Sequence, residues 1–456
     1  MYRSIFNDRD YIQTLTVVAL PLVLQQVITY SVNLLDTMMI GSFGDATLAA
    51  VNLVNQFFLL FSMLMFGAVS GGNVLNAQFW GRRDIKSIHR VMGMQLIFGL
   101  VMGTIFLTVS QLFPAQILSI YSKDANVIQD GVIYLRIISL AFLLFPIGQF
   151  FGGALRSTGN TRTPMVVSII TLGINALLNF ILIFGKLGVP VLGLVGAGIA
   201  TVIARAVECI LYITLTYKFQ LPPAASLKEM LSFNSGLAKL LSQKGLPVIL
   251  NETIWGLGTN TYAATYAAIS TTSIAAFSAV SPVDNIAQAL FIGVGDASAV
   301  IEGALLGAGN FDKAERYSKN TLTLSISLSV ITGLLLLGLR TPILSLYNLS
   351  AEAHQLAFSL LTVLAVTLWL RTTNYTMIIG ILRPGGDAAY ALIIETIAMW
   401  CIGIPMARIL GLRLGLPVYI AYLGSVTEEF LKMLILFRRY FSKKWLVVIG
   451  AEEGEA

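Results

Sequence analysis

Long apolar runs follow one another along the chain and are separated by short polar segments. The first run, LPLVLQQVITYSVNLLDTMMIG at residues 20–41, is representative of the others. Because a helix of about 20 apolar residues crosses the hydrocarbon core of a membrane, this pattern predicts about twelve membrane-spanning helices. The predicted spans are 14–42, 48–78, 91–113, 131–152, 166–185, 195–217, 246–268, 274–306, 320–339, 356–379, 388–408 and 417–437.

The apolar runs are continuous, whereas the strands of a membrane β-barrel alternate apolar and polar residues over short segments. Of the 456 residues, 56% are hydrophobic and 11% are charged, and the mean hydropathy is +0.80. None of the polar stretches is long enough for a separate soluble domain. The predicted fold class is therefore an all-α polytopic membrane protein.

Lysine and arginine residues are distributed unevenly between the predicted loops. If the N-terminus is cytoplasmic, the inside segments hold 20 of them, Arg383 included, and the outside loops hold 5. Membrane proteins retain Lys and Arg on the cytoplasmic side, so with an even number of helices both termini are predicted to be cytoplasmic. This placement accounts for the net charge of +6 without a nucleic-acid partner.

The two halves of the chain repeat each other. Pro21 matches Pro247, and ILSIY at Ile117 matches ILSLY at Ile343, both at an offset of 226 residues. A constant offset over such a length indicates duplication, and an even number of helices in each half gives both halves the same orientation. We expect two pseudo-symmetric six-helix lobes, an N-lobe (1–217) and a C-lobe (246–456), joined by a cytoplasmic linker (218–245).

Charged residues inside the spans are costly, so each one needs a partner or a function. Arg205 lies three residues before Glu208, and Lys432 follows Glu428 and Glu429 by four and three residues, which predicts local ion pairs. The charged residues without a local partner are the acids Asp36, Glu252, Asp284, Asp296, Glu302 and Glu395 and the bases Arg136 and Arg371. A net acidic interior attracts cations and disfavours anionic cargo.

Asp36 is the strongest candidate for the residue that binds a coupling ion. Gln25, Thr29, Asn33 and Asp36 form one polar stripe on the first span. The stripe must face protein or water, and Pro21 predicts a bend in the same helix. Asp36 is also the predicted ligand if the ion is Na+.

The fifth span carries a second polar stripe, formed by Thr171, Asn175 and Asn179 at steps of four residues. Their neutral oxygens could complete the shell of a hard cation or bind a protonated acid. The alternative is a structural role as hydrogen-bonding contacts between helices.

A third stripe lies on the seventh span and consists of Glu252, Trp255, Thr259, Tyr262 and Tyr266. Glu252 is a further candidate for an ion-coupling residue. The alternative interpretation is an ion pair with Arg371, which Glu395 could also neutralise. The predicted substrate cavity combines the polar and aromatic residues of both halves: Gln25, Thr29, Asn33, Trp255, Thr259, Tyr262, Asp284, Gln288, Arg371 and Glu395.

Several functions lack their motifs. The chain has no GxxxxGK[ST] sequence for nucleotide phosphates and no HExxH or nucleophile–base pair, so we predict neither an enzyme nor a cofactor. His89 and His354 are expected in loops, and Cys209 and Cys401 on separate helices. Transport is therefore expected to draw on an ion gradient.

The motifs GGALRSTGNTRTPM, INALLNFILIFG, GLVGAGIAT, LPVILNETIWGLG and LLGAGNFDKA occur in order along the chain, together with GILRPGGD. In this order the sequence resembles the multidrug and toxic compound extrusion (MATE) family over nearly its whole length. The resemblance implies a V-shaped pair of lobes in a prokaryotic inner membrane that exports lipophilic cations as a monomer in exchange for Na+ or H+.

The resemblance also implies roles for single residues. Asp36 falls at the position of the first-helix coupling carboxylate, with Asn175, Asn179, Tyr134 and Thr201 as its neighbours. Glu252 resembles a seventh-helix acid of another branch of the family, whose tenth-helix acid is replaced here by a region containing Arg371 and Asn374. Two other carriers stay open as alternatives, a flippase for lipid-linked sugars from the same superfamily and a major-facilitator carrier.

Overall fold

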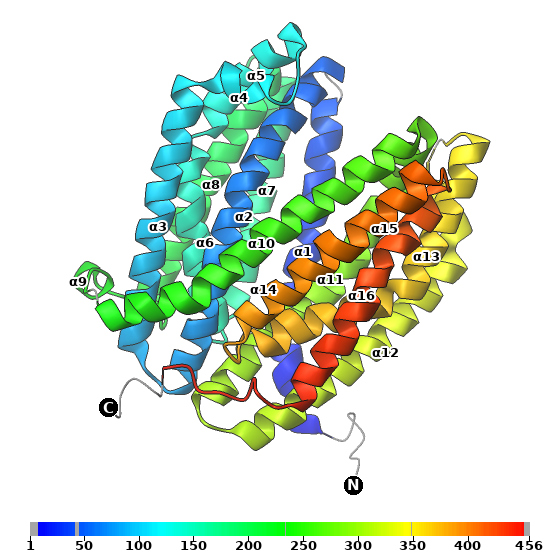
Figure 1. Cartoon of the computed structure of the whole chain (residues 1–456). Helices are drawn as coiled ribbons and strands as arrows, with labels where there is room; N and C mark the ends of the chain where they lie inside the picture. The colour runs from blue at the N-terminus through cyan, green and yellow to red at the C-terminus, as the bar shows by residue number, and fades with distance from the viewer. Residues whose placement is uncertain (1–7, 42–44, 233, 348, 451–456) are drawn as a thin grey trace. The chain divides into compact units, whose positions relative to one another are not determined.

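The computed structural model describes residues 8–41, 45–232, 234–347 and 349–450, and for residues 33–38, 40, 41, 45 and 46 it describes only the backbone. The described part is helical, without a β-strand (Figure 1). The helices are α1 (Arg9–Gly41), α2 (Asp45–Gly81), α3 (Ile85–Leu112), α4 (Pro114–Ser119), α5 (Ala125–Ile138), α6 (Ala141–Ser157), α7 (Arg162–Phe184), α8 (Gly193–Lys218), α9 (Leu227–Met230), α10 (Ser235–Ile269), α11 (Thr271–Gly307), α12 (Phe311–Leu344), α13 (Ala351–Tyr375), η2 (Thr376–Leu382), α14 (Ala388–Ile397), η3 (Ala398–Gly403), α15 (Ile404–Arg408), η4 (Ile409–Arg413) and α16 (Val418–Phe441).

The long helices coincide with the predicted spans. Within the described ranges, 9 helices are long and apolar enough to cross a membrane, and the pair α5–α6, bent by 50°, would be another span. The remaining two predicted spans are α10 and α16, which are more polar than the other long helices. α10 carries Glu252, and α16 carries Glu428, Glu429 and Lys432. The prediction of an all-α fold is confirmed.

The described chain divides into two compact units. Residues 24–245 form one, here called the N-unit, and the described parts of residues 1–23 and 246–456 form the other, here called the C-unit. Helices α1 and α10 therefore each contribute residues to both units. The lobe limits predicted from the sequence remain predictions.

Six phenylalanine side chains hold the helices of the N-unit together. They come from α2, α3 and α6, and their ring centroids lie 4.8 to 6.3 Å apart: Phe57, Phe58, Phe61, Phe106, Phe142 and Phe145. Such pairs of rings stabilise packing beyond the apolar area that they bury. This cluster fixes α6 against α2 and α3.

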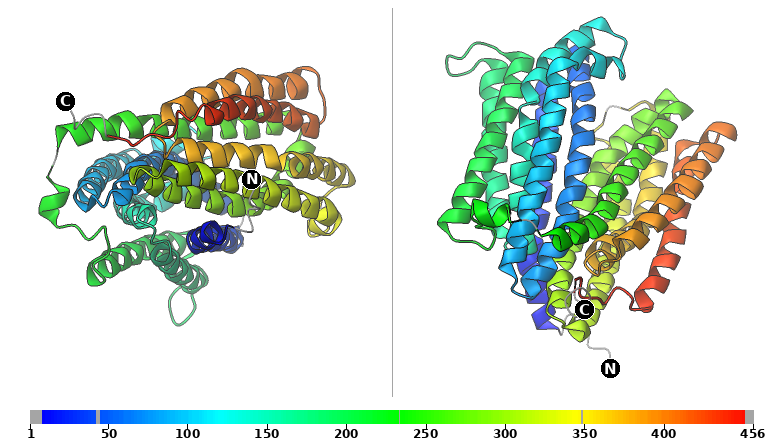
Figure 2. Two further views of the ribbon diagram at one scale, coloured as in Figure 1. Left: turned by 90° about the horizontal axis from the view of Figure 1, so that it is seen from below. Right: turned by 60° about the vertical axis from the view of Figure 1, so that its left-hand side comes forward.

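The start of α1 packs within the C-unit. The Tyr11 hydroxyl donates to Thr321 Oγ1 at 3.0 Å, and the Tyr317 hydroxyl donates to Asp10 at 2.6 Å. Ser318, beside Tyr317 on α12, shares a hydrogen bond of 3.0 Å with Tyr440 near the end of α16. The beginning of α1 and the end of α16 therefore lie at the same end of the C-unit, as Figures 1 and 2 show.

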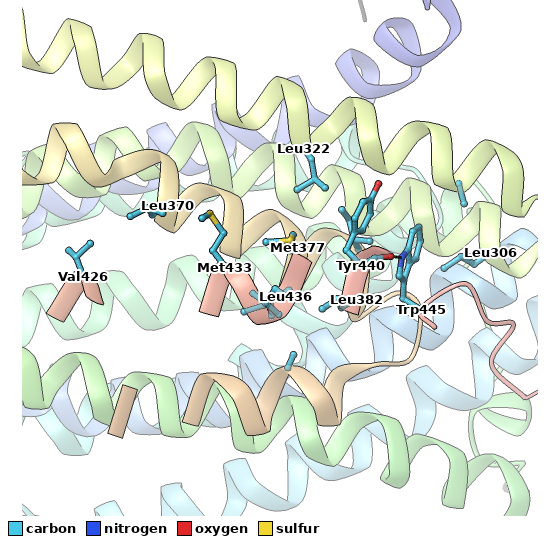
Figure 3. Packing of buried hydrophobic residues seen from close by; sticks show 14 residues of the cluster. Leu306, Leu322, Leu370, Met377, Leu382, Val426, Met433, Leu436, Tyr440 and Trp445 are labelled. Carbon is cyan, nitrogen blue, oxygen red and sulfur yellow. Dashed lines mark hydrogen bonds between the residues drawn. The ribbon is translucent and has the colours of Figure 1, made fainter. Parts of the chain in front are cut away.

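The C-unit has an apolar core of residues from α11, α12, α13, η2 and α16, and Figure 3 shows its packing. Trp445, which follows α16, is a buried member of this core. Its ring stacks on Tyr440 at a centroid distance of 5.8 Å, and its Nε1 donates to the Tyr440 carbonyl at 3.2 Å. The segment after α16 is thus fixed to the bundle by a buried aromatic side chain.

We expect Trp445→Ala to destabilise the protein, because it leaves a cavity beside Tyr440 and removes a buried indole. Truncations of this kind cost about 3–5 kcal/mol. Thermal unfolding of the purified full chain in detergent measures the effect, and Trp400→Ala, an exposed indole, is the matched control. Equal melting temperatures for the two variants would contradict this role of Trp445.

The tenth and eleventh spans contain π-helical stretches. η2 continues α13, while η3 and η4 flank the single turn of α15. π-helical turns leave the regular pattern of backbone hydrogen bonds and often occur at functional sites. In the described chain these irregular turns all lie in the C-unit, close to its buried charged residues.

Candidate functional site

The polar stripe of α1 contacts α7 through Gln25. Gln25 Nε2 donates to Ser168 Oγ at 2.7 Å, and the Thr29 hydroxyl donates to the Gln25 carbonyl at 2.8 Å. Asn33 and Asp36 lie on the same helix, and their side chains fall outside the described residues. The predicted coupling role of Asp36 therefore stays a prediction.

The polar stripe of α7 is buried in the N-unit. Thr171, Asn175 and Asn179 all have little exposed surface, and Asn179 Nδ2 donates to Asn175 Oδ1 at 3.4 Å. Thr171 bonds the Val167 carbonyl of its own helix at 3.0 Å. An amide has an acceptor oxygen and donor N–H groups, so buried asparagines can bind either a cation or a protonated acid.

The other two predicted neighbours of Asp36 also lie in the N-unit. Tyr134 on α5 is buried, and α8 packs closely against it at Gly198, where an added Cβ would be 3.4 Å from Tyr134 Cδ2. Thr201 on α8 is half-buried, and its hydroxyl donates to the Ala197 carbonyl at 3.0 Å. The predicted ion-coupling role of these residues is untested.

The local ion pairs expected from the sequence are present. Arg205 Nη1 lies 2.7 Å from Glu208 Oε2 in the N-unit. In the C-unit, Lys432 Nζ lies 3.0 Å from Glu429 Oε1 and 3.7 Å from Glu428 Oε1. Both predictions of local pairing are confirmed.

Arg371 is not the partner of Glu252 or Glu395, as the two alternative interpretations supposed. Its Nη1 donates to Asp284 Oδ2 at 3.0 Å and to the Tyr422 hydroxyl at 3.1 Å. Both alternatives are wrong, because the eighth span brings a carboxylate closer to Arg371. The predicted substrate-cavity residues Arg371 and Asp284 are thus a neutral pair.

Glu252 binds Arg383, a partner that the sequence analysis did not consider. Arg383 Nη1 lies 2.6 Å from Glu252 Oε1, and Arg383 is only 2% exposed. Arg383 lies in the turn that follows η2, as expected for a loop residue, but its side chain is buried in the C-unit. Its predicted position on the cytoplasmic side stays a prediction.

Two further acids have hydrogen-bonding partners. Asn251 Nδ2 donates to Glu395 Oε2 at 2.5 Å, and the Tyr375 hydroxyl donates to Asp296 Oδ1 at 3.1 Å. Glu302 is different, because it is buried and neither of its oxygens has a hydrogen-bond partner in the described chain. An acid in such surroundings is stable only in its neutral form or beside a cation.

The remaining predicted cavity residues lie in different environments of the C-unit. Trp255 is 43% exposed, while Gln288 and Thr259 are half-buried. Tyr262 is buried and its ring lies parallel to that of Tyr266, with 6.2 Å between centroids. A cavity shared by these residues with Gln25 and Thr29 stays a prediction.

The histidines do not lie in loops. His89 is buried on α3 with its Nε2 2.8 Å from the Pro222 carbonyl, and His354 lies on α13. Neither prediction was correct, because each helix begins before the predicted span. Among the side chains that the structure describes, no three His, Cys, Asp or Glu residues gather as metal ligands.

The predicted linker (218–245) is part of the N-unit and contacts α3 through Glu229. Ser226 and Glu229 form a capping box at the start of α9, and Glu229 lies 3.5 Å from the His89 ring. Hydrogen bonds from the Ser226 backbone and hydroxyl hold the pKa of Glu229 below its ordinary value.

The sequence profile of the MatE family matches the chain at residues 21–181 and 247–409. The chain belongs to the MATE family. The two matched segments begin 226 residues apart, at Pro21 and Pro247, which is the offset of the internal repeat. The predicted duplication into two six-helix lobes thus agrees with the family profile.

Curated relatives of this MATE protein are bacterial transporters. It is 26% identical over 438 residues to the probable multidrug resistance protein YoeA of Bacillus subtilis, covering 94% of this chain and 93% of the relative. It is also 28% identical over 426 residues to the probable multidrug resistance protein NorM of Halalkalibacterium halodurans, with 90% of both chains covered. The uncharacterized transporter YisQ of Bacillus subtilis is 24% identical over 414 residues, again with 90% of both chains covered.

Solved structures share the fold. An outward-facing multidrug resistance MATE transporter of the MOP superfamily superposes with a TM-score of 0.86 at 18% identity, covering 94% of this chain and 95% of the other. A MATE transporter crystallised with MaL6 gives a TM-score of 0.85 at 19% identity, with 94% and 96% covered. Membership of this family also makes the major-facilitator alternative wrong.

Proposed function

We propose that this MATE protein is an antiporter that exports lipophilic organic cations in exchange for Na+ or H+, with Asp36 as the coupling carboxylate. The supporting observation is the excess of acidic groups inside the described helices. Arg371, Arg383 and Lys432 each have a carboxylate partner within 3.0 Å. Glu395, Glu428 and Glu302 are acids beyond these pairs.

An acidic interior determines whether the transported compound is a cation or an anion. A buried carboxylate lowers the free energy of a nearby cation and raises that of an anion, especially where water is excluded. The exposed Trp255 and the tyrosines of α10 add faces on which an organic cation can stack. The flippase alternative needs free basic groups for phosphate, and the described basic residues of the C-unit interior already bind carboxylates.

The coupling of export to the ion gradient follows from competition between the ion and the substrate. Asp36 lies on the same helix as Gln25, which donates to Ser168 of α7. The proposal takes Asn175 and Asn179, two buried amides of α7, as the neighbours of Asp36. If ion binding and substrate binding favour different states of the carrier, each ligand lowers the affinity for the other. The cation gradient then drives export, and no nucleotide or cofactor is required. We propose the same setting for the whole chain, a monomer in the inner membrane of a prokaryote with both termini cytoplasmic.

Efflux from proteoliposomes tests this proposal. We expect reconstituted protein to move tetraphenylphosphonium against its gradient when a Na+ or a pH gradient is imposed alone, and to stop when both gradients are collapsed. Efflux that follows added ATP, or efflux of an anionic lipid-linked sugar in place of the cation, would contradict it.

A further inference from the structure

Apart from each other, two polar atoms in the C-unit have no hydrogen-bond partner among the described residues although both are buried. Glu428 is 3% exposed, and its Oε2 is unpaired, while its Oε1 lies 3.7 Å from Lys432 Nζ. The Tyr262 hydroxyl on α10 is also unpaired. Unsatisfied polar groups of this kind cost free energy unless they serve a function.

Both atoms lie beside Gly403, where a side chain on that residue would begin. A Cβ on Gly403 would lie 2.6 Å from Glu428 Oε2 and would overlap the Tyr262 hydroxyl. The absence of a side chain at this residue therefore keeps room for the carboxyl and the phenol to meet. Gly403 is the last residue of η3, so the meeting point lies against a π-helical turn.

The other acids of the region are already satisfied. Glu429 binds Lys432 and accepts a hydrogen bond of 2.6 Å from Asn374 Nδ2. Glu395 accepts from Asn251, Asp284 binds Arg371 and Glu252 binds Arg383. Glu428 is left with a single, longer contact to an ammonium group that Glu429 holds more closely.

Groups from three helices influence whether the Glu428 carboxyl is ionised or neutral. They are Lys432 and Glu429 from α16, Tyr262 and Tyr266 from α10, and Glu395 from α14. Lys432 favours the ionised carboxylate, whereas burial and the two other acids favour the neutral acid. Because these influences oppose each other, a change in hydration or in a neighbouring charge can shift the balance between the two forms.

We propose that Glu428 is a proton-exchange site of the C-unit, in addition to the coupling carboxylate of the N-unit. In the ionised state Glu428 Oε2 accepts the Tyr262 hydroxyl proton in a hydrogen bond. When Glu428 takes up one proton, its new O–H donates to the Tyr262 oxygen, so the bond reverses direction and the net charge rises by one. This proposal deepens the proposed antiport and rests on it for its role in transport.

The bound ion is a proton and not Na+ for two reasons. The Lys432 ammonium is 3.7 Å from Glu428 and repels a second cation, whereas a proton neutralises the carboxylate. A sodium ion also needs several oxygen ligands, and the two oxygens nearest to Gly403 among the described residues belong to Glu428 and Tyr262.

Infrared titration of the full chain in detergent tests the site. In wild-type protein the carbonyl band of a neutral carboxylic acid should grow as the pH falls, and Glu428→Gln should remove about one titrating carboxyl per chain. Tyr262→Phe should shift the midpoint of the same band and leave its size unchanged. Glu315→Gln, an exposed acid paired with Lys443, is the matched control. It should remove only its own carboxyl from the total, and the component that is lost in Glu428→Gln should keep its wild-type size and midpoint. If Glu428→Gln leaves the titrating band unchanged, or if Tyr262→Phe moves no midpoint, the proposal is overturned.

A second measurement separates this proposal from the proposed function. Addition of tetraphenylphosphonium to weakly buffered wild-type protein should release protons, and Glu428→Gln should release about one fewer per chain. If wild-type protein neither binds nor exports the cation, the proposed function fails, while the infrared band still tests Glu428. If export is intact and proton release is identical in both proteins, the coupling role of Glu428 fails alone.

Discussion

Cells that express Asp36→Asn are expected to be as sensitive to exported cationic drugs as cells without the transporter. An amide has nearly the shape of the carboxylate and keeps the fold, but it carries no charge that Na+ or H+ can neutralise in each cycle. Drug resistance and the amount of protein in the membrane fraction are the two measurements.

The control for Asp36→Asn is Asp312→Asn, which removes an exposed carboxylate from the first turn of α12. This variant should retain wild-type resistance at the same membrane level. Resistance retained by Asp36→Asn itself would refute the role of that carboxylate, and a loss of both resistance and membrane protein would point to misfolding instead.

Lys432→Met should unfold the C-unit at much lower temperature. The substitution leaves Glu428 and Glu429 buried without their ammonium partner, and removal of one member of a buried ion pair costs about 3–5 kcal/mol. Thermal unfolding in detergent, followed by circular dichroism, reports the loss. Lys443→Met, which breaks the exposed pair with Glu315, is the matched control and should cost about 0–1 kcal/mol.

A compensating variant distinguishes charge from packing in Lys432→Met. Adding Glu429→Gln removes the carboxylate that lies 3.0 Å from Lys432, so it should recover part of the lost stability. No recovery in the double variant would mean that the Lys432 stem, and not its charge, stabilises the unit.

The helices and the repeat could be predicted from the sequence because both are local or periodic features. Apolar runs follow from the thickness of the membrane, and the offset between Pro21 and Pro247 needs no structure to be seen. The pairs of Arg205 and Lys432 were predictable for the same reason, since residues three or four apart meet on one helix face.

The long-range pairs could not be predicted from spacing. Asp284 and Arg371 are 87 residues apart, and only the packing of α11 against α13 decides that they meet. Glu252 pairs with Arg383 because the tenth helix continues as η2, while the RPGG sequence after it is typical of a loop. The approach of Glu428 and Tyr262 to Gly403 depends on three separate helices, α16, α10 and η3, and leaves no pattern in the sequence.

The most direct test of the central claim is the affinity for tetraphenylphosphonium of the wild-type and Asp36→Asn proteins, measured at equilibrium over a range of Na+ concentrations and pH values. We predict that Na+ or H+ lowers the affinity of the wild-type protein for tetraphenylphosphonium. In Asp36→Asn the affinity should depend less on the concentration of that ion. An affinity that is independent of both ions in the wild-type protein, or the same ion dependence in both proteins, would contradict the account.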